Sequence, residues 1–171
     1  MSPSFVALSL ERLTNELETW KWHHRQVPDQ WELQRITTDT TTARRLVDSA
    51  QRHLASAAII SEDDPECAFA ATYDAAHKAC SALLEAQGLR PTSRGGHIVV
   101  RDAVTAQFAD LPGGQVLRSF DRLRRRRNDI EYPGDDYDID PDEVEEATHR
   151  AKEIVDFADE LIDHLPVYRA R

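Results

Sequence analysis

The sequence of 171 residues has little cysteine, little glycine and no long hydrophobic run, and each shortage excludes a class of protein. Its two cysteines, Cys67 and Cys80, are too few for a disulfide framework and match no zinc-binding spacing, so we expect both to be small helix residues. Six glycines are few for the many tight turns of a β-sandwich or barrel. No apolar segment approaches the roughly 20 residues that cross a bilayer, so we expect no membrane partner. Met1 to Leu10 lacks the pattern of a secretory signal, and we therefore expect a cytoplasmic protein.

Acidic residues outnumber basic ones, but the basic residues are concentrated in one segment. The chain carries 31 Asp and Glu against 21 Lys and Arg, a formal net charge of -10, which argues against indiscriminate coating of DNA. Six arginines nevertheless fall between Arg118 and Arg127, and such a density would attract phosphate groups. Ten acidic residues follow between Asp129 and Glu146 and could neutralise them, within the chain or across a dimer.

Apolar residues recur at helical spacing from Thr40 onward, which predicts an all-α protein with one domain. Asp64, Pro65 and Glu66 form a typical helix start, and Asp140 with Glu143 has the spacing of a capping box. Short connections between the helices predict an antiparallel up-and-down bundle. The expected helices are Thr40 to Ala57 after a Thr-rich cap, Asp64 to Gly88, Val100 to Phe108, Val116 to Ile130, and Asp140 to Leu165.

Residues 1–39 do not continue this pattern. Three tryptophans, Trp20, Trp22 and Trp31, cluster around Pro28, where the helical spacing fails. This N-terminal segment could be an irregular arm, a short hairpin or a second layer packed on the bundle of residues 40–171. Its His23-His24 pair could stack on nucleic-acid bases, although packing of the arm onto the bundle is the favoured role.

Arg127 is the first candidate functional residue. Continuing the apolar spacing of Phe120 and Leu123 places Arg127 on the seam that faces the bundle, just before Ile130. A guanidinium stays charged and is costly to bury without a partner, so this side chain needs an acid, a phosphate or a water-filled cleft. A structural alternative is an ion pair with an acid on a neighbouring helix, such as Asp74.

The residues around Arg127 carry a family resemblance. Arg127-Asn128, followed by Asp129 to Tyr132 and by Pro133-Gly134, resembles the motif helix of HEPN domains, in which an Arg and a polar residue precede a His. The segment from Ala71 to Ala79, a Leu-Leu pair, the break from Gly88 to Pro91 and Gly95-Gly96-His97 also resemble a HEPN helix and its continuation. The resemblance spans about Thr40 to Leu165 and includes the order of the helices.

The resemblance implies a HEPN-type helical bundle that forms a homodimer. Many HEPN domains are metal-independent ribonucleases of toxin–antitoxin or defence systems, often encoded with a nucleotidyltransferase-like partner. The resemblance implies that Arg127 and Asn128 contact an RNA phosphodiester in a cleft between subunits, and that no metal or cofactor is needed. An antitoxin or a nucleotidyltransferase would then be a possible protein partner.

This sequence departs from the family at the motif histidine. The positions where it should fall hold Tyr132, Pro133 and Gly134. A tyrosine hydroxyl, with a pKa near 10, is a poor general base at neutral pH, so Glu131 would be the base and Tyr132 a donor to a phosphate oxygen.

Other side chains could contribute to the same site. His97, at a helix start that favours anions, and His77, beside the stripe of the preceding helix, are candidate substrate contacts together with Arg124. Two functions stay open at this point. One is an RNA-cleaving effector, a metal-independent ribonuclease with an Arg-Asn-x3-Tyr site, and the other is an inactive HEPN module that binds RNA, a nucleotide or a protein.

Overall fold

The computed structural model describes residues 33–92, 96–132 and 138–168. Within these residues the chain forms five α-helices, one short 3-10 helix and two three-residue strands. The elements in chain order are β1 (Leu33–Arg35), α2 (Thr40–Ile60), α3 (Pro65–Ala86), β2 (Leu89–Pro91), α4 (Gly96–Phe108), η2 (Gly114–Leu117), α5 (Arg118–Glu131) and α6 (Pro141–Leu161). The all-α prediction is confirmed.

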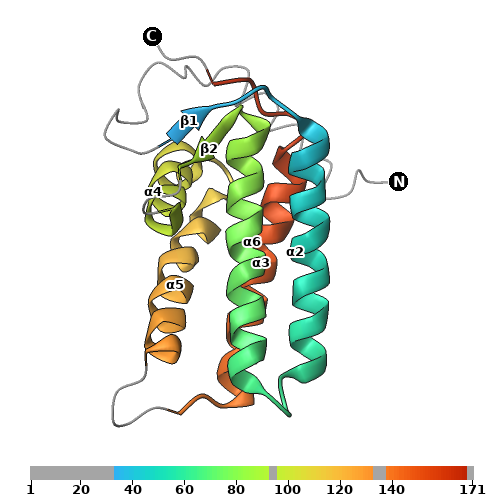
Figure 1. Cartoon of the computed structure of the whole chain (residues 1–171), viewed down its shortest axis with the longest axis vertical. Helices are drawn as coiled ribbons and strands as arrows, with labels where there is room; N and C mark the ends of the chain where they lie inside the picture. The colour runs from blue at the N-terminus through green and yellow to red at the C-terminus, as the bar shows by residue number, and fades with distance from the viewer. Residues whose placement is uncertain (1–32, 93–95, 133–137, 169–171) are drawn as a thin grey trace.

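The helix α3 is the centre of the bundle, because it contacts each of the other four α-helices. Figure 1 shows α2, α3 and α6 side by side as the three long helices, with α4 and α5 stacked along one side of α3. Along the chain α3 runs opposite to α2, and α6 runs opposite to α5 (Figure 1). This is the antiparallel up-and-down arrangement expected from the short connections.

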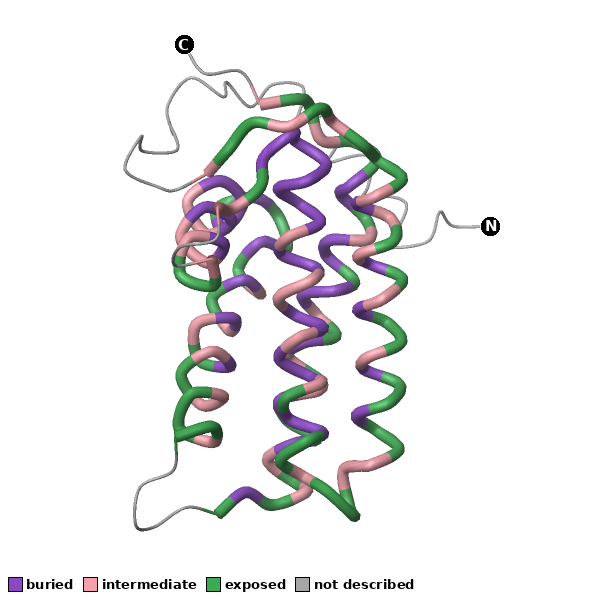
Figure 2. Tube along the Cα trace, viewed as in Figure 1, coloured by how far each residue is buried: buried purple, intermediate pink, exposed green. Residues whose placement is uncertain are grey.

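Burial explains why α3 takes the central place. Apolar residues spaced by threes and fours along this helix are all buried, namely Phe69, Tyr73, Ala76, Cys80, Leu83 and Ala86. Ala75, Ala79 and Ala82, which lie outside this stripe, are buried as well. Figure 2 shows buried residues around most of α3, whereas α2 buries a single stripe. Small alanines let neighbouring helices approach α3 from several directions, and they bury apolar surface without loss of side-chain entropy.

Of the three helix caps predicted from the sequence, two are present in the structure. The Asp64 carboxylate accepts a hydrogen bond from the Cys67 amide at 3.0 Å, and Asp140 accepts one from the Glu143 amide at 2.8 Å. The cap of α2 is Asp39, which accepts from the Thr41 amide at 2.9 Å, and not one of the threonines that follow. Asp39 caps better because its charged oxygens suit the positive end of the helix.

The two-stranded sheet was not expected. β1 pairs antiparallel with β2, with Gln34 opposite Arg90, and joins the segment before the bundle to the turn after α3. At that turn Gly88 has φ +76°, and a Cβ there would lie 2.9 Å from the Ile36 carbonyl oxygen. Only glycine meets both conditions without strain. The tryptophans and His23-His24 of the N-terminal segment, and Pro133-Gly134, lie outside the described residues.

The described helices include none that is long and apolar enough to cross a membrane.

Candidate functional site

The five arginines of α5 from Arg122 to Arg127 point in different directions around the helix axis, and the structure separates them into three groups. Arg124 and Arg127 line a pocket with α3 and α4, and Arg122 and Arg126 line a second pocket with α6. Arg125 is exposed on the outside of the helix, where it forms an ion pair with Asp121. The run of arginines therefore divides according to helical periodicity, as residues three and four apart share a face.

The first pocket, which we call the α4–α5 pocket, combines residues from three helices. Its volume is about 340 Å³. It brings together four of the residues singled out in the sequence, namely Arg124, Arg127, Asn128 and His97. The remaining lining residues, not expected from the sequence as site residues, are Tyr73, Gly96 and Ile98.

Arg127 is partly buried, with 35% of its side chain exposed. Its guanidinium forms an ion pair with Glu131, one turn later on the same helix. The guanidinium carbon also lies 5.9 Å from the centroid of the Tyr73 ring, a cation–π distance. The pairing with Asp74 considered from the sequence is wrong, because Asp74 forms an ion pair with Lys78 and lies 3.0 Å from Nδ1 of His53 instead. A same-helix partner leaves the guanidinium on the pocket wall rather than locking it between helices.

Tyr73 connects the pocket to the core. Its ring is stacked on Phe120 with centroids 5.7 Å apart and planes within 3°. Its hydroxyl lies 2.8 Å from Nδ1 of His97, so one of the two groups donates to the other. Burial raises the pKa of Tyr73 to about 12, opposed by the nearby Arg127 and Arg124, and the phenol therefore stays protonated at neutral pH.

His97 is the titratable group of the pocket. Partial burial lowers its pKa, and the positive charges of Arg127 and Arg124 act in the same direction while Asp74 opposes them. The imidazole is therefore neutral at pH 7, with one nitrogen able to accept a proton. Since Nδ1 is engaged by Tyr73, Nε2 is the nitrogen that a ligand can meet.

His77 lies behind His97, and the two ring centroids are 4.4 Å apart. Burial lowers the pKa of His77 to about 4, and the neighbouring His97 and Lys78 lower it further against the opposing effect of Asp74. Its Nε2 is buried without a hydrogen-bond partner. His77 does not line the pocket surface among the described residues, so its contact with a ligand would pass through His97.

Asp121, an acidic residue of α5 that faces α4, holds Arg124 in place. Asp121 binds Arg101 of α4 at 2.7 Å and Arg124 at 3.0 Å, and it also pairs with Arg125. The hydrogen bond from Arg101 is the largest influence that lowers the pKa of Asp121, to about 2. A permanently charged carboxylate therefore holds α4 and α5 together beside the pocket.

The remaining sequence candidates lie at the end of α5. Glu131 is exposed and bound to Arg127. Tyr132 follows the last helical residue, is 77% exposed and does not line the described pocket. Their predicted roles thus depend on a ligand or a second subunit that extends past the pocket.

No cluster of three or more His, Cys, Asp or Glu side chains suited to a metal occurs within the described parts of the chain. Both cysteines are free thiols. Cys80 is buried in the core, and burial raises the pKa of its thiol.

A family model, the HEPN domain, matches residues 43–161. This match begins in α2 and ends with α6, so it contains all three helices that line the α4–α5 pocket. No curated protein and no solved structure matches the chain.

Proposed function

The chain belongs to the HEPN domain family, as the sequence predicted, and we propose that it is an RNA-directed effector of a toxin–antitoxin or defence system that cleaves RNA without a metal ion. One observation carries this proposal. The α4–α5 pocket places two arginines and an asparagine beside a neutral imidazole, on one accessible surface. Cations that hold a phosphate and a group that moves a proton are the two parts that such a reaction needs.

In the proposed reaction, Arg127 and Arg124 hold the phosphodiester and stabilise the charge that develops on its oxygens. Asn128 donates a hydrogen bond from its amide to a phosphate oxygen. The ribose 2′-hydroxyl loses its proton to a base and attacks the adjacent phosphorus. The bond from phosphorus to the 5′-oxygen breaks, that oxygen takes up a proton, and the products are a 2′,3′-cyclic phosphate and a 5′-hydroxyl.

His97 is the base that the geometry favours. In the tautomer that carries hydrogen on Nδ1, His97 donates to the Tyr73 hydroxyl, and Nε2 is free to accept the 2′-hydroxyl proton. The hydrogen bond to Tyr73 fixes the orientation of the imidazole ring, as the hydrogen bond from a carboxylate orients a catalytic histidine. Glu131 is the other candidate base, but its carboxylate is bound to Arg127. Tyr132 would donate to the phosphate only from outside the pocket.

A homodimer would complete this site. HEPN domains commonly pair so that two arginine sites share a cleft, and a second copy would supply the acid that protonates the leaving oxygen. An antitoxin or a nucleotidyltransferase-like protein is the proposed regulatory partner, and the cytoplasm, where RNA is accessible, is the proposed location.

The test is cleavage of a mixed pool of RNA by the purified full chain in the presence of EDTA. We expect cleavage with cyclic phosphate ends, a large loss in Arg127→Gln and His97→Gln, and no change in Arg52→Gln. Arg52 is the control because it is an exposed arginine of α2 and lines neither the α4–α5 pocket nor the pocket between α5 and α6. Full activity in Arg127→Gln would overturn the proposal.

The alternative from the sequence, a catalytically inactive HEPN module, has its own support. The motif histidine is missing, and Glu131 already occupies the Arg127 guanidinium. The same variants distinguish the two functions, because this alternative requires that RNA is bound but left uncut and that Arg127→Gln weakens the binding. Circular dichroism and the oligomeric state of each variant confirm that a loss does not come from misfolding.

A further inference from the structure

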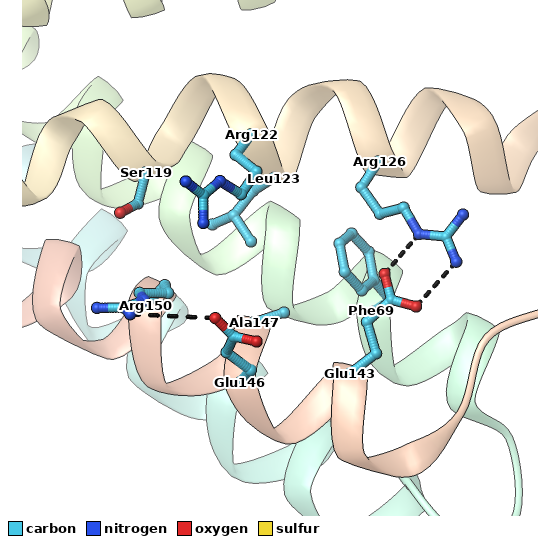
Figure 3. A pocket seen from close by; sticks show the side chains of 9 residues that line it. All are labelled: Phe69, Ser119, Arg122, Leu123, Arg126, Glu143, Glu146, Ala147 and Arg150. Carbon is cyan, nitrogen blue, oxygen red and sulfur yellow. Dashed lines mark hydrogen bonds and ion pairs between the residues drawn. The ribbon is translucent and has the colours of Figure 1, made fainter.

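A second pocket lies on the opposite flank of α5, between α5 and α6, and we call it the α5–α6 pocket. Figure 3 shows it from close by, with side chains from both helices directed into the space between them. Its volume is about 140 Å³. The buried Phe69, Leu123 and Ala147 form an apolar base, while Ser119, Arg122 and Arg150 lie at one end.

The volume of the pocket suits one small ring. A cavity of about 150 Å³ lined by apolar side chains is large enough for benzene. The α5–α6 pocket is of that size, and its apolar base suits the face of a flat ring. Because the pocket is open on one side, a purine, with two fused rings, would extend into solvent and bury a smaller share of its surface.

The charged residues that line the pocket are three arginines and two glutamates, so positive charge is in excess. Arg126 is committed to Glu143, with Nη2 at 2.8 Å from Oε2. Arg150 is shared between Glu153 at 3.4 Å and Glu146 at 4.0 Å, both distances beyond a short ion pair.

Arg122 differs from both of these arginines. It forms no ion pair with another residue of the described chain, and in Figure 3 its guanidinium lies between the two helices with no dashed line to a neighbour. This leaves one positive charge and the Ser119 hydroxyl at the same end of an apolar slot. A ligand with a ring and an adjacent anion would satisfy both features.

We propose that the α5–α6 pocket binds a pyrimidine nucleotide, with the base on Phe69, Leu123 and Ala147 and the phosphate on Arg122. The Glu146 carboxylate, held only at 4.0 Å by Arg150, accepts a hydrogen bond from the N–H edge of the base, N3–H of uracil or the amino group of cytosine. The Arg122 guanidinium binds the phosphate, and the Ser119 hydroxyl donates to one of its oxygens. The nucleotide is either free or one residue of an RNA strand.

If the nucleotide is one residue of an RNA strand, the inference deepens the proposed function and rests on it. The two pockets lie on different sides of α5, which is about 10–12 Å across with its side chains. A strand that crosses the outer face of α5, where Arg125 is exposed, would reach both pockets. Base recognition in the α5–α6 pocket would then select which phosphodiester enters the α4–α5 pocket.

The experiment measures binding of UMP, CMP, AMP and GMP by isothermal titration calorimetry, and of oligo-U, oligo-C and oligo-A by fluorescence anisotropy. We expect the pyrimidine ligands to bind at least about tenfold more tightly than the purine ligands. Arg122→Gln should weaken pyrimidine binding by about tenfold, since it removes a charge-assisted hydrogen bond. Arg118→Gln is the matched control, an exposed arginine at the start of the same helix that does not line the pocket.

A second variant, Ser119→Trp, fills the end of the pocket from a partly exposed position and should abolish the pyrimidine preference. Tight binding of UMP with weak binding of oligo-U identifies a free nucleotide as the ligand. Tight binding of oligo-U with weak binding of UMP identifies RNA as the ligand. Both results support the proposed pyrimidine site. Equal binding of purines and pyrimidines, or no effect of Arg122→Gln, would overturn it. RNA cleavage that depends on Arg127 but shows no base preference would refute RNA as the source of the nucleotide and leave the proposed function standing. RNA binding that does not depend on Arg127 would refute the proposed function.

Discussion

Acidification should destabilise the protein through His77. In the folded chain burial lowers the pKa of His77 to about 4, whereas an unfolded histidine titrates near 6.5. Between these two values the unfolded state binds a proton that the folded state does not. The free energy of unfolding therefore falls as the pH decreases from about 6.5 to about 4, and it is unaffected by this group above that range.

The magnitude follows from the difference between the two pKa values. At 1.36 kcal/mol for each pH unit, a difference of about 2.5 corresponds to about 3 kcal/mol, most of it lost by pH 4.5. His97, whose pKa is also lowered, adds a loss of the same sign. Asp121 has its pKa lowered to about 2 and so contributes a separate loss only below about pH 4.

The assay is urea denaturation at intervals from pH 7.5 to pH 4.5 for the wild type and His77→Gln. The variant should lose about 2–3 kcal/mol less than the wild type over this range. His149→Gln, which removes a histidine with 68% of its side chain exposed, should behave as the wild type. If His77→Gln and the wild type lose equal free energy, or the His77 ring titrates at pH 6 or above by NMR, the reasoning is refuted.

Three further predictions concern the site and its support. Tyr73→Phe keeps the ring stack but removes the hydrogen bond to His97, so it should cost about 1 kcal/mol of stability in thermal unfolding and lower kcat more than it changes KM. Glu131→Gln releases Arg127 and should tighten RNA binding in a filter assay with cleavage retained; loss of cleavage would identify Glu131 as the base in place of His97. Gly88→Ala places a side chain at φ +76° and should destabilise the fold by at least about 1–2 kcal/mol in urea denaturation, whereas an unchanged midpoint would contradict the strain argument.

The long helices could be predicted from the sequence because their signals are local. Asp64 and Asp140 stand directly before periodic apolar segments, and both cap the helices that follow. The sheet could not be predicted, because a strand of three residues shows no period and its partner lies more than fifty positions away. Glu143 shows a different limit. Its spacing suits a capping box, but its carboxylate binds Arg126 of α5, a partner set by the packing of two helices.

The α4–α5 pocket could be predicted in part, because the sequence already singles out His97 at the start of another helix. Helical spacing groups Arg124, Arg127 and Asn128 because they are close in sequence. In the sequence, Tyr73 occupies one more position of the apolar stripe of its helix. Neighbouring residues in the sequence do not indicate that its hydroxyl contacts His97 of another helix. Contacts between helices depend on the whole bundle, so the side chain that orients the imidazole could be found only in three dimensions.

Helix α5 packs on the bundle through few buried residues, and this has a consequence for the hydrogen exchange of its amides. This helix buries only Phe120 and Leu123, while its ion pairs join it to α4 through Arg101 and to α6 through Glu143. Ion pairs with partly exposed partners stabilise weakly and are screened by salt. The amides of α5 should therefore exchange through local opening at a lower free energy than those of α3, and faster as salt rises. Both pockets include residues of α5, so a bound anion would slow this opening, and ligand occupancy would be readable as protection of a single helix.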